Sequence, residues 1–355
     1  MRRGCPGMKR QYSLDVLRII ATILIIFHHY QQITGTYFEG SLNFHGGDFS
    51  FGMVVEFFFV LSGFLAQHYI SKIKAGCTFQ TFILQKAKRL LPLVFISSVT
   101  YEVLLFVYKH VCQTSWLLGN DVTIWGTIIT GLGIQAGWVF ENPAVNNPTW
   151  YISVLLLCYV IFYFLVYVSN RKHIPDTYLY IGMVFLGVGV YSHNIHLPFL
   201  NEFSSRGFYA FFFGLLLAKV LAGRALNGKW CLASLAVVIL STYGLLNHYI
   251  YFDYGILYFM TFLYYPACII FCLSQPVTGI FCHKVLGTLG AITFDAYIWH
   301  LPMMLLMYIL LKLLPANPDI QTWQAMLLFT VSAFGVGTLS HFLMEKPINR
   351  LTSLR

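Results

Sequence analysis

Stretches of about twenty mostly apolar residues recur along the whole chain, each close to the length that a helix needs to cross a bilayer. Composition supports a membrane location, because 58% of the 355 residues are hydrophobic and only 10% are charged. An average soluble domain has ~25% charged residues. The sequence therefore predicts an all-α, polytopic integral membrane helical bundle with about ten transmembrane helices. The predicted spans are 14–34, 52–70, 90–108, 149–169, 178–192, 204–222, 231–247, 255–273, 288–312 and 323–343.

The positions of the basic residues indicate how these spans are oriented. Most of the 22 Lys and Arg residues fall in alternate connecting segments, and an excess of such residues marks the cytoplasmic side. Both termini are therefore predicted to be cytoplasmic. The Gly-rich apolar stretch near 122–140 is predicted to be a re-entrant or interfacial segment, because an extra span there would invert every later segment. The net charge of +9 follows from this topology and does not indicate nucleic-acid binding.

The chain is predicted to form a single transmembrane domain over residues 1–355, since no internal repeat or linker interrupts it. The basic segment Met1–Arg10 precedes an apolar run, as in a signal peptide. Asp15 and Arg18 interrupt that run, so it is predicted to be a retained first span. The eight cysteines form no C-x-x-C pair and no Cys/His cluster with metal-ligand spacing. No metal site is predicted.

Ionisable side chains inside the predicted spans mark a candidate site, because they are costly in a bilayer. Arg18 and His29 are eleven residues apart, so on a helix they return to within ~20° of one face with a rise of ~16 Å. His28 lies off that face. Glu56 lies at a depth matching His29 and is predicted to orient its imidazole and raise its basicity. His300 lies near mid-membrane in the ninth span.

These residues also have structural interpretations. A single intramembrane histidine can simply bond neighbouring helices, and Arg18 can extend to the lipid headgroups. Placing Arg18, His29, Glu56 and His300 all against lipid would be too costly, so together they indicate a buried polar site.

A basic cluster, Lys86, Lys88 and Arg89, lies at the predicted cytoplasmic end of the third span. Closely spaced cations suit the phosphates of a nucleotide-like ligand. The alternative is that these residues only contribute to the cytoplasmic excess of positive charge.

Taken in order, the motifs resemble acyltransferase family 3, the membrane O-acyltransferases that modify bacterial surface polysaccharides. The resemblance covers essentially the whole chain. It is carried by Leu14 to Ala21 with the Arg18-x10-His29 spacing, Glu56 to Phe64, Lys86-x-x-Arg89-x-x-Pro92, Thr149 to Ser153, Arg206 to Gly214, Tyr297 to Pro302, and Glu345-Lys346-Pro347.

Three positions depart from the family pattern. Lys86 replaces the commoner Arg, which keeps the charge but loses the bidentate geometry. Leu155 stands where many members have Glu. Asp295 stands where a small residue is usual, and nothing in the sequence explains it.

The resemblance implies an enzyme that transfers an acyl group, with acetyl the usual one, from cytoplasmic acyl-CoA to a hydroxyl of an exported sugar or glycolipid. Acetyl-CoA is then a donor substrate and no tightly bound cofactor is expected. Its phosphates would lie near Lys86, Lys88 and Arg89, and its pantetheine arm would pass Arg18. The lipid bilayer of a bacterial cell membrane would surround the protein, and a homo-oligomer is compatible with the sequence.

For the chemistry, His29 is predicted to be either a general base or a transient acyl carrier, with Glu56 orienting it. His300 is predicted to stabilise the oxyanion or to orient the acceptor. The acceptor would be bound by Asn147, Trp150, Tyr151 and Arg206.

Two other classes of function remain open from the sequence. A transporter or flippase of a lipid-linked glycan could line its path with the same polar groups. A receptor or scaffold would need no chemistry at all. Neither gives a reason for the basic cluster beneath Arg18 and His29.

Overall fold

The computed structural model describes residues 11–46, 50–116, 123–140, 145–247, 249–250, 254–314 and 318–353. Within these ranges the regular structure is helical and contains no named strand, as predicted. The helices are α1 (Tyr12–Thr34), α2 (Val54–Ala66), α3 (Ile70–Lys74), α4 (Phe79–Cys112), α5 (Ile124–Gly131), α6 (Trp150–Lys172), α7 (Asp176–Ser192), α8 (Glu202–Leu221), α9 (Gly228–Leu246), α10 (Tyr254–Phe259), α11 (Tyr265–Leu273), α12 (Gln275–Ile280), α13 (Lys284–Leu313), α14 (Trp323–Ser340) and α15 (Lys346–Ser353).

Nine helical segments in the described part of the chain are long and apolar enough to cross a membrane. They correspond to nine of the ten predicted spans. The tenth, α7, has 17 residues, which is at the lower limit of spanning length. The prediction of a polytopic helical bundle is therefore confirmed. The predicted cytoplasmic location of both termini stays a prediction, and residues 1–10, 354 and 355 lie outside the described part.

The Gly-rich stretch after α4 does not form a further span among the described residues. It contains α5, with eight residues, which at 1.5 Å per residue is ~12 Å long. The turns that follow α5 pack against the bundle: Gln135 is buried, and the Trp138 indole donates a 2.9 Å hydrogen bond to the Ser153 carbonyl. The prediction that this stretch adds no transmembrane helix is confirmed.

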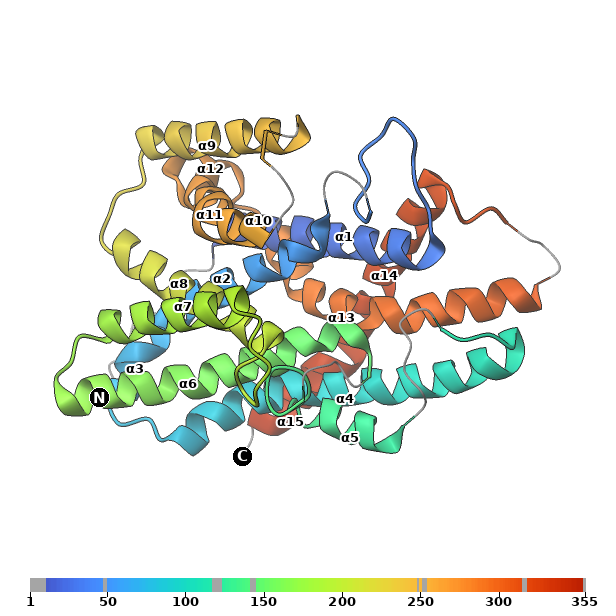
Figure 1. Ribbon diagram of the computed structural model, residues 1–355, viewed down its shortest axis with the longest axis horizontal. Helices are drawn as coiled ribbons and strands as arrows, with labels where there is room; N and C mark the ends of the chain where they lie inside the picture. The colour runs from blue at the N-terminus through green and yellow to red at the C-terminus, as the bar shows by residue number, and fades with distance from the viewer. Residues whose placement is uncertain are drawn as a thin grey trace.

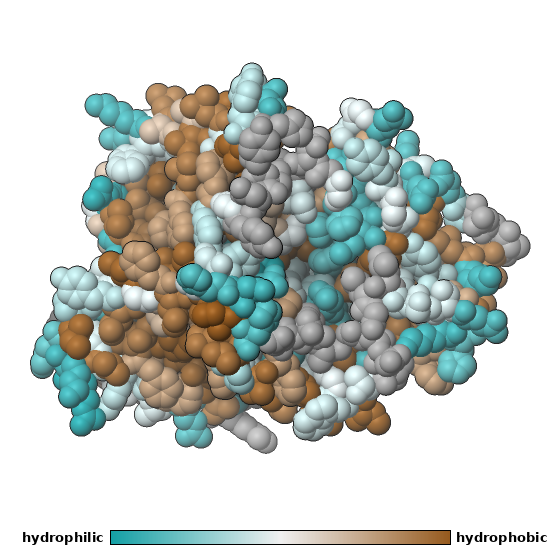
Figure 2. All heavy atoms as spheres, viewed as in Figure 1, coloured by the Kyte–Doolittle hydropathy of each residue, from teal (hydrophilic) through white to brown (hydrophobic). Residues whose placement is uncertain are grey.

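The helices run roughly side by side along the long axis of the molecule (Figure 1). Hydrophobic side chains gather over α6, α7, α9 and α11, whereas hydrophilic ones lie at the ends of the bundle and also near the middle of this face (Figure 2). Large apolar side chains such as Phe185 on α7, Leu232 on α9 and Val331 on α14 are exposed. Apolar surface on this scale fits contact with lipid acyl chains and not with water.

Two glycines bring α2 and α8 together. A Cβ on Gly63 would lie 1.9 Å from the Phe211 carbonyl oxygen, and one on Gly214 would lie 2.1 Å from the Val60 carbonyl oxygen. Only glycine allows the two backbones to approach so closely, which is a common way for membrane helices to associate. This contact, in the second half of each helix, holds α2 and α8 side by side.

A second group of helices surrounds α13, which packs against α1, α4 and α14. Gly337 of α14 lies against Ala296, where a Cβ would come within 2.7 Å of the Ala296 backbone nitrogen. The first span α1 ends at Gly35, whose φ of +66° forms a left-handed C-cap. His29 therefore lies in the last two turns of α1, facing α13.

Candidate active site

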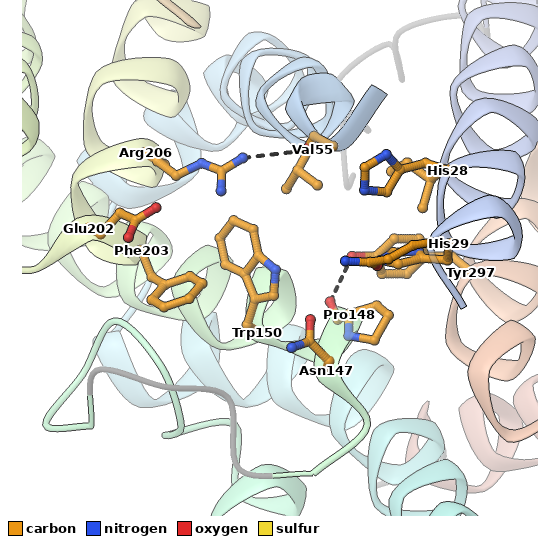
Figure 3. Close-up of a pocket in the computed structure, with 13 residues that line it drawn as sticks. His28, His29, Val55, Asn147, Pro148, Trp150, Glu202, Phe203, Arg206 and Tyr297 are labelled. Atoms are coloured by element: carbon orange, nitrogen blue, oxygen red, sulfur yellow. Dashed lines mark hydrogen bonds between the residues drawn. The ribbon is translucent and has the colours of Figure 1, made fainter. Parts of the chain in front are cut away.

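A cavity of about 290 Å³ opens between α1 and α8, close to the lower end of the ~300–1,000 Å³ typical of small-ligand sites. Figure 3 shows His28 and His29 of α1 on one side and Glu202, Phe203 and Arg206 of α8 on the other. The cavity is lined by Ile25, His28, His29, Gln32, Gly52, Val55, Asn147, Pro148, Trp150, Glu202, Phe203, Arg206 and Tyr297.

His29 is held by a second histidine. The Nδ1 atom of His29 lies 3.0 Å from Nε2 of His300, and Nδ1 of His300 lies 2.5 Å from the Tyr297 carbonyl oxygen. A carbonyl oxygen can only accept, so Nδ1 of His300 carries a proton and, in the neutral ring, Nε2 does not. His29 must then donate from Nδ1. Its own Nε2 is left with a free lone pair.

The arrangement makes His29 a proton acceptor inside the cavity. Its Nδ1 edge faces His300, so the Nε2 edge faces the space that the cavity residues enclose. His300 is fully buried and is not among the described residues that line the cavity. The predicted direct contact of His300 with substrate is therefore not supported by its position. His300 instead orients the His29 ring and fixes its tautomer.

Glu56 does not meet His29, which corrects the predicted pairing. Its carboxylate is fully buried and accepts two hydrogen bonds from Arg206, from Nε to Oε1 and from Nη2 to Oε2 (3.0 Å), and a third at 3.4 Å from the Tyr209 hydroxyl. The cause is the close approach of α2 and α8 at Gly63 and Gly214, which places Glu56 and Arg206 opposite each other.

The Glu56–Arg206 pair positions the far wall of the cavity. The guanidinium of Arg206 lies over the Trp150 ring, 4.9 Å from its centroid, and also donates to the Gly52 carbonyl at 3.4 Å. A buried, doubly bonded ion pair fixes both geometry and charge. Arg206 therefore presents a fixed cation, stacked on Trp150, to the cavity.

Sequence reasoning missed several residues of this wall. Glu202 and Phe203 begin α8, where Asn201 and Ser204 form a capping box that fixes the first turn. Glu202 is exposed and lines the cavity beside the predicted residues Asn147 and Trp150. The four-residue spacing of Glu202 and Arg206 puts them on one helix face. This spacing is visible in the sequence and could have identified Glu202 as a residue of the same wall.

His28 also lines the cavity, although helical periodicity places it off the face of Arg18 and His29. Its Nδ1 donates to the Phe44 carbonyl at 2.8 Å, so its Nε2 is also unprotonated in the neutral ring. Gly52 leaves the space that this ring occupies, since a Cβ there would lie 3.2 Å from Cε1 of His28. Two adjacent histidines therefore reach the cavity.

A third imidazole lies behind His28. The rings of His28 and His45 meet edge to face with centroids 4.9 Å apart. Burial lowers the pKa of His45 from its ordinary value, because the charged ring loses hydration. This loop histidine therefore favours the neutral form in the folded protein.

Tyr151, predicted to bind the acceptor, is not brought to the cavity. Its hydroxyl lies 3.0 Å from the Ser62 hydroxyl and donates to the Phe58 carbonyl at 3.3 Å. Its ring packs beneath the cavity, with centroids 6.1 Å from Tyr297. Tyr297 in turn donates a 2.6 Å hydrogen bond to the Pro148 carbonyl. Tyr297 therefore lines the cavity, and Tyr151 packs behind it.

The predicted donor residues lie elsewhere in the bundle. Arg18 forms a 2.9 Å ion pair with Asp15, and neither residue lines the cavity. Lys88 and Arg89 are exposed on the first turns of α4, which begins eleven residues before the predicted span 90–108. The structure thus separates the predicted donor end from His29.

Lys86 differs from its two neighbours. It is buried, with Nζ 3.5 Å from the ring centroid of Tyr69 and 4.6 Å from that of Tyr159. A cation enclosed by aromatic rings is stabilised by their quadrupoles. The ammonium group of Lys86 therefore interacts with aromatic rings inside the protein, and only Lys88 and Arg89 of this basic cluster are accessible to a phosphate.

Comparison with known protein families matches residues 11–342 to an acyltransferase domain, acyltransferase 3. The match spans nearly the whole chain and includes every residue that lines the cavity. No curated protein and no solved structure matches the chain.

Proposed function

The chain belongs to the acyltransferase 3 family, and from that premise we propose that it transfers an acyl group, most simply acetyl, from acyl-CoA to a hydroxyl of an exported sugar. The family match confirms the resemblance in the sequence and supports a multi-pass membrane acyltransferase. The donor, the acyl group, the sugar acceptor and a bacterial cell membrane are parts of the proposal.

The chemical proposal rests on one geometric observation, the contacts from the Tyr297 carbonyl to His300 and from His300 to Nδ1 of His29. In neutral rings these contacts assign the proton of His29 to Nδ1 and leave its Nε2 unprotonated toward the cavity. As a general base, Nε2 takes the proton of the acceptor hydroxyl while the hydroxyl oxygen attacks the thioester carbonyl carbon. A carbon–oxygen bond forms, the carbon–sulfur bond breaks, and the imidazolium returns its proton to the departing thiolate. No charge accumulates over the cycle.

The same nitrogen suits a covalent route. Nε2 would then attack the thioester carbonyl carbon, and the carbon–sulfur bond would break to leave an acyl-imidazolium and a thiolate. In a second step the acceptor hydroxyl attacks the acyl carbon, the carbon–nitrogen bond breaks, and the hydroxyl proton passes to the thiolate. Both routes need the lone pair of His29. Trapping an acyl adduct on His29 would favour the covalent route, and turnover only through a ternary complex would favour the base.

The far wall of the cavity supports a sugar acceptor. Trp150 and Phe203 offer aromatic faces, with ring centroids 4.9 Å apart and edge-to-face planes, on which the C–H face of a sugar ring can pack. Glu202, Asn147 and Arg206 add hydrogen-bonding groups around these rings. A few polar groups converging beside an aromatic surface suit the recognition of a hydroxylated ligand.

The donor would approach from the opposite end of the bundle. Lys88 and Arg89 are exposed there and suit the phosphates of a CoA thioester. The rise of ~16 Å along α1 from Arg18 to His29 has to be crossed by the pantetheine arm. A thioester from one side and a sugar from the other would meet at His29.

Purified protein in nanodiscs tests the proposal through thiol release from acetyl-CoA, with a surface-polysaccharide fraction as acceptor. We expect release by the wild type and a loss of ~10²–10⁴-fold in His29→Ala, the usual contribution of a general base. The control is His193→Ala, an exposed histidine away from the cavity. If folded wild type releases no thiol with any acyl-CoA and a varied acceptor pool, the proposal fails and a glycan transporter or flippase replaces it.

A further inference from the structure

A cluster of three titratable side chains lies outside the cavity, where α13 meets the end of α14. It consists of Asp295 of α13 and of His341 and Glu345, which begin and end the π-helical turn between α14 and α15. All three residues are buried, and one ligand atom of each lies within 4.8 Å of the others. The sequence offers no account of Asp295, and the chemistry at His29 does not use this cluster.

The hydrogen bonds of the cluster leave one carboxylate oxygen without a donor. Asp295 Oδ1 accepts from the Ser340 hydroxyl at 2.7 Å, and Ser340 accepts from the Trp299 indole at 2.8 Å. Asp295 Oδ2 has no hydrogen-bond partner among the described residues, although Asp295 is fully buried and Oδ2 lies 3.3 Å from Nδ1 of His341. A buried, unpaired carboxylate oxygen is costly unless a proton or a metal cation satisfies it.

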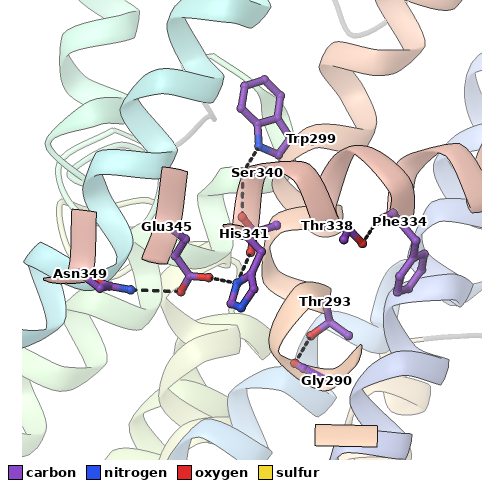
Figure 4. Close-up of polar contacts among 10 residues, drawn as sticks. Gly290, Thr293, Trp299, Phe334, Thr338, Ser340, His341, Glu345 and Asn349 are labelled. Atoms are coloured by element: carbon purple, nitrogen blue, oxygen red, sulfur yellow. Dashed lines mark hydrogen bonds and ion pairs between the residues drawn. The ribbon is translucent and has the colours of Figure 1, made fainter. Parts of the chain in front are cut away.

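His341 cannot satisfy both carboxylates. Its Nδ1 contacts Glu345 Oε2 as well as Asp295 Oδ2, but a ring nitrogen carries at most one hydrogen. Figure 4 shows His341 pointing to Glu345, whose second oxygen accepts from Asn349 at 3.4 Å. Two carboxylate oxygens and one imidazole nitrogen therefore converge on a point where one proton serves at most one of the two contacts.

We propose that Asp295, His341 and Glu345 bind a divalent transition-metal cation, with Zn²⁺ the best match. One imidazole nitrogen with two carboxylate oxygens is a zinc-compatible donor set. At Zn–ligand distances of ~2.0–2.2 Å, two atoms of a tetrahedral site lie roughly 3.4 Å apart, close to the 3.3 Å between Asp295 Oδ2 and His341 Nδ1. The contact between His341 Nδ1 and Glu345 Oε2 is shorter than this, so these two side chains would have to move apart to admit the metal.

The π-helical turn gives this site its geometry. His341 and Glu345 are four residues apart on the widened turn His341–Glu345, and such turns are frequent at functional sites. Gly337, one turn earlier, lets α14 approach Ala296 beside Asp295. The metal would join α13 to α14 and α15, five residues along α13 from His300. It is a structural site for this bundle and takes no part in the acyl transfer.

Metal content and thermal stability of the wild type test the site directly. Protein purified in detergent is washed with EDTA, equilibrated with Zn²⁺, passed over a desalting column and assayed by mass spectrometry of the metal. We expect one tightly held zinc per chain and a melting temperature that rises with Zn²⁺ but not with Mg²⁺, because a ligand of the folded state stabilises it. Zinc X-ray absorption should show nitrogen and oxygen ligands without sulfur, which excludes the cysteines.

The variants Asp295→Asn and His341→Gln should lose both the zinc and the shift in melting temperature. Glu39→Gln and His193→Ala, which change an exposed carboxylate and an exposed imidazole, should keep both. If a variant does not fold, the wild-type stoichiometry and absorption spectrum still decide. Folded wild type without stoichiometric zinc, a sulfur-containing zinc shell, or full zinc retention by folded Asp295→Asn would each overturn the proposal and leave a hydrogen-bonded histidine–carboxylate cluster.

Discussion

The imidazoles of His29 and His300 meet across α1 and α13, with Nδ1 of His29 3.0 Å from Nε2 of His300. The two residues are 271 positions apart in the chain, so only the packing of α1 against α13 brings them together. The Tyr297 carbonyl sets the proton on His300, His300 sets the proton on His29, and His29 presents its lone pair to the cavity. A backbone carbonyl and a second histidine thus do what a carboxylate often does for a catalytic histidine.

Replacing His300 should therefore affect turnover through His29. Gln supplies a carbonyl oxygen that can accept from Nδ1 of His29, whereas Leu supplies no acceptor. We expect His300→Leu to lower kcat on the order of 10²-fold, within the range of general-base contributions, with the KM for acyl-CoA little changed. His300→Gln should recover part of this loss. Steady-state thiol release measures both constants, and equal activities of the Leu and Gln variants would contradict an acceptor role for His300.

Removing one partner of the buried Glu56–Arg206 pair should destabilise the protein strongly. Glu56→Gln leaves the Arg206 guanidinium without its counter-charge, and breaking a buried pair in this way costs ~3–5 kcal/mol. The double variant Glu56→Gln/Arg206→Met, which buries no unpaired charge, should be less destabilised than Glu56→Gln alone. Glu39→Gln, an exposed carboxylate, is the control. Melting temperatures in detergent give the comparison, and a double variant no more stable than Glu56→Gln would rule out this explanation.

The sequence predicted the fold well and the site only in part. Nine of the ten predicted spans, and the absence of a span among the described residues 123–140, follow from length, hydropathy and the Lys/Arg pattern, which act locally along the chain. His29, Asn147, Trp150 and Arg206 were identified and do line the cavity. The pairing of side chains could not be predicted, because it depends on how each helix is rotated about its axis and on which helices pack against each other.

Glu56 shows the difference. Its depth in α2 matches that of His29, as the sequence indicates, but its direction is set by glycine contacts with α8, a helix about 150 residues away. The burial of Lys86 also depends on contacts with other helices, because Tyr69 and Tyr159, which enclose it, do not belong to α4. Helical periodicity gives the position of a residue around its own helix and does not reveal which neighbour it faces.

The glycine contacts themselves can be tested without altering the site chemistry. Gly214→Ala places a Cβ 2.1 Å from the Val60 carbonyl oxygen, and relief requires a backbone shift that typically costs ~1–3 kcal/mol. We expect a lower melting temperature and reduced turnover, because the shift would separate Glu56 from Arg206. Gly335→Ala, where a Cβ meets nothing within 4 Å, is the matched control. A Gly214→Ala protein as stable as the Gly335→Ala protein would contradict the close approach.

His45, in the loop after α1, should make the stability of the folded protein depend on pH. Its pKa is lowered by burial in the folded state, so below the ordinary value of ~6.5 the unfolded state binds more protons. Stability is thus present above that pH and decreases as the pH falls below it. We expect His45→Asn to lose less melting temperature than wild type between pH 7.5 and 5.5. His173→Asn, an exposed histidine, should behave like the wild type, and identical losses in all three proteins would show that His45 makes no contribution.

Variants at Arg89 and Lys86 should affect different properties, although the two residues lie one turn apart on α4. Changes at Arg89 should weaken donor binding, and changes at Lys86 should lower stability. Arg89 is exposed, so Arg89→Ala should raise the KM for acyl-CoA by about tenfold, the worth of one charge-assisted contact of ~1.4 kcal/mol, with kcat and melting temperature unchanged. Lys86 is enclosed by Tyr69 and Tyr159, so Lys86→Ala should lower the melting temperature, because it removes the cation–π contacts and leaves a cavity. Lys86→Met, which refills the space, should restore much of that stability. An Arg89→Ala protein with an unchanged KM, or a Lys86→Ala protein as stable as the wild type but with weakened donor binding, would reverse these two assignments.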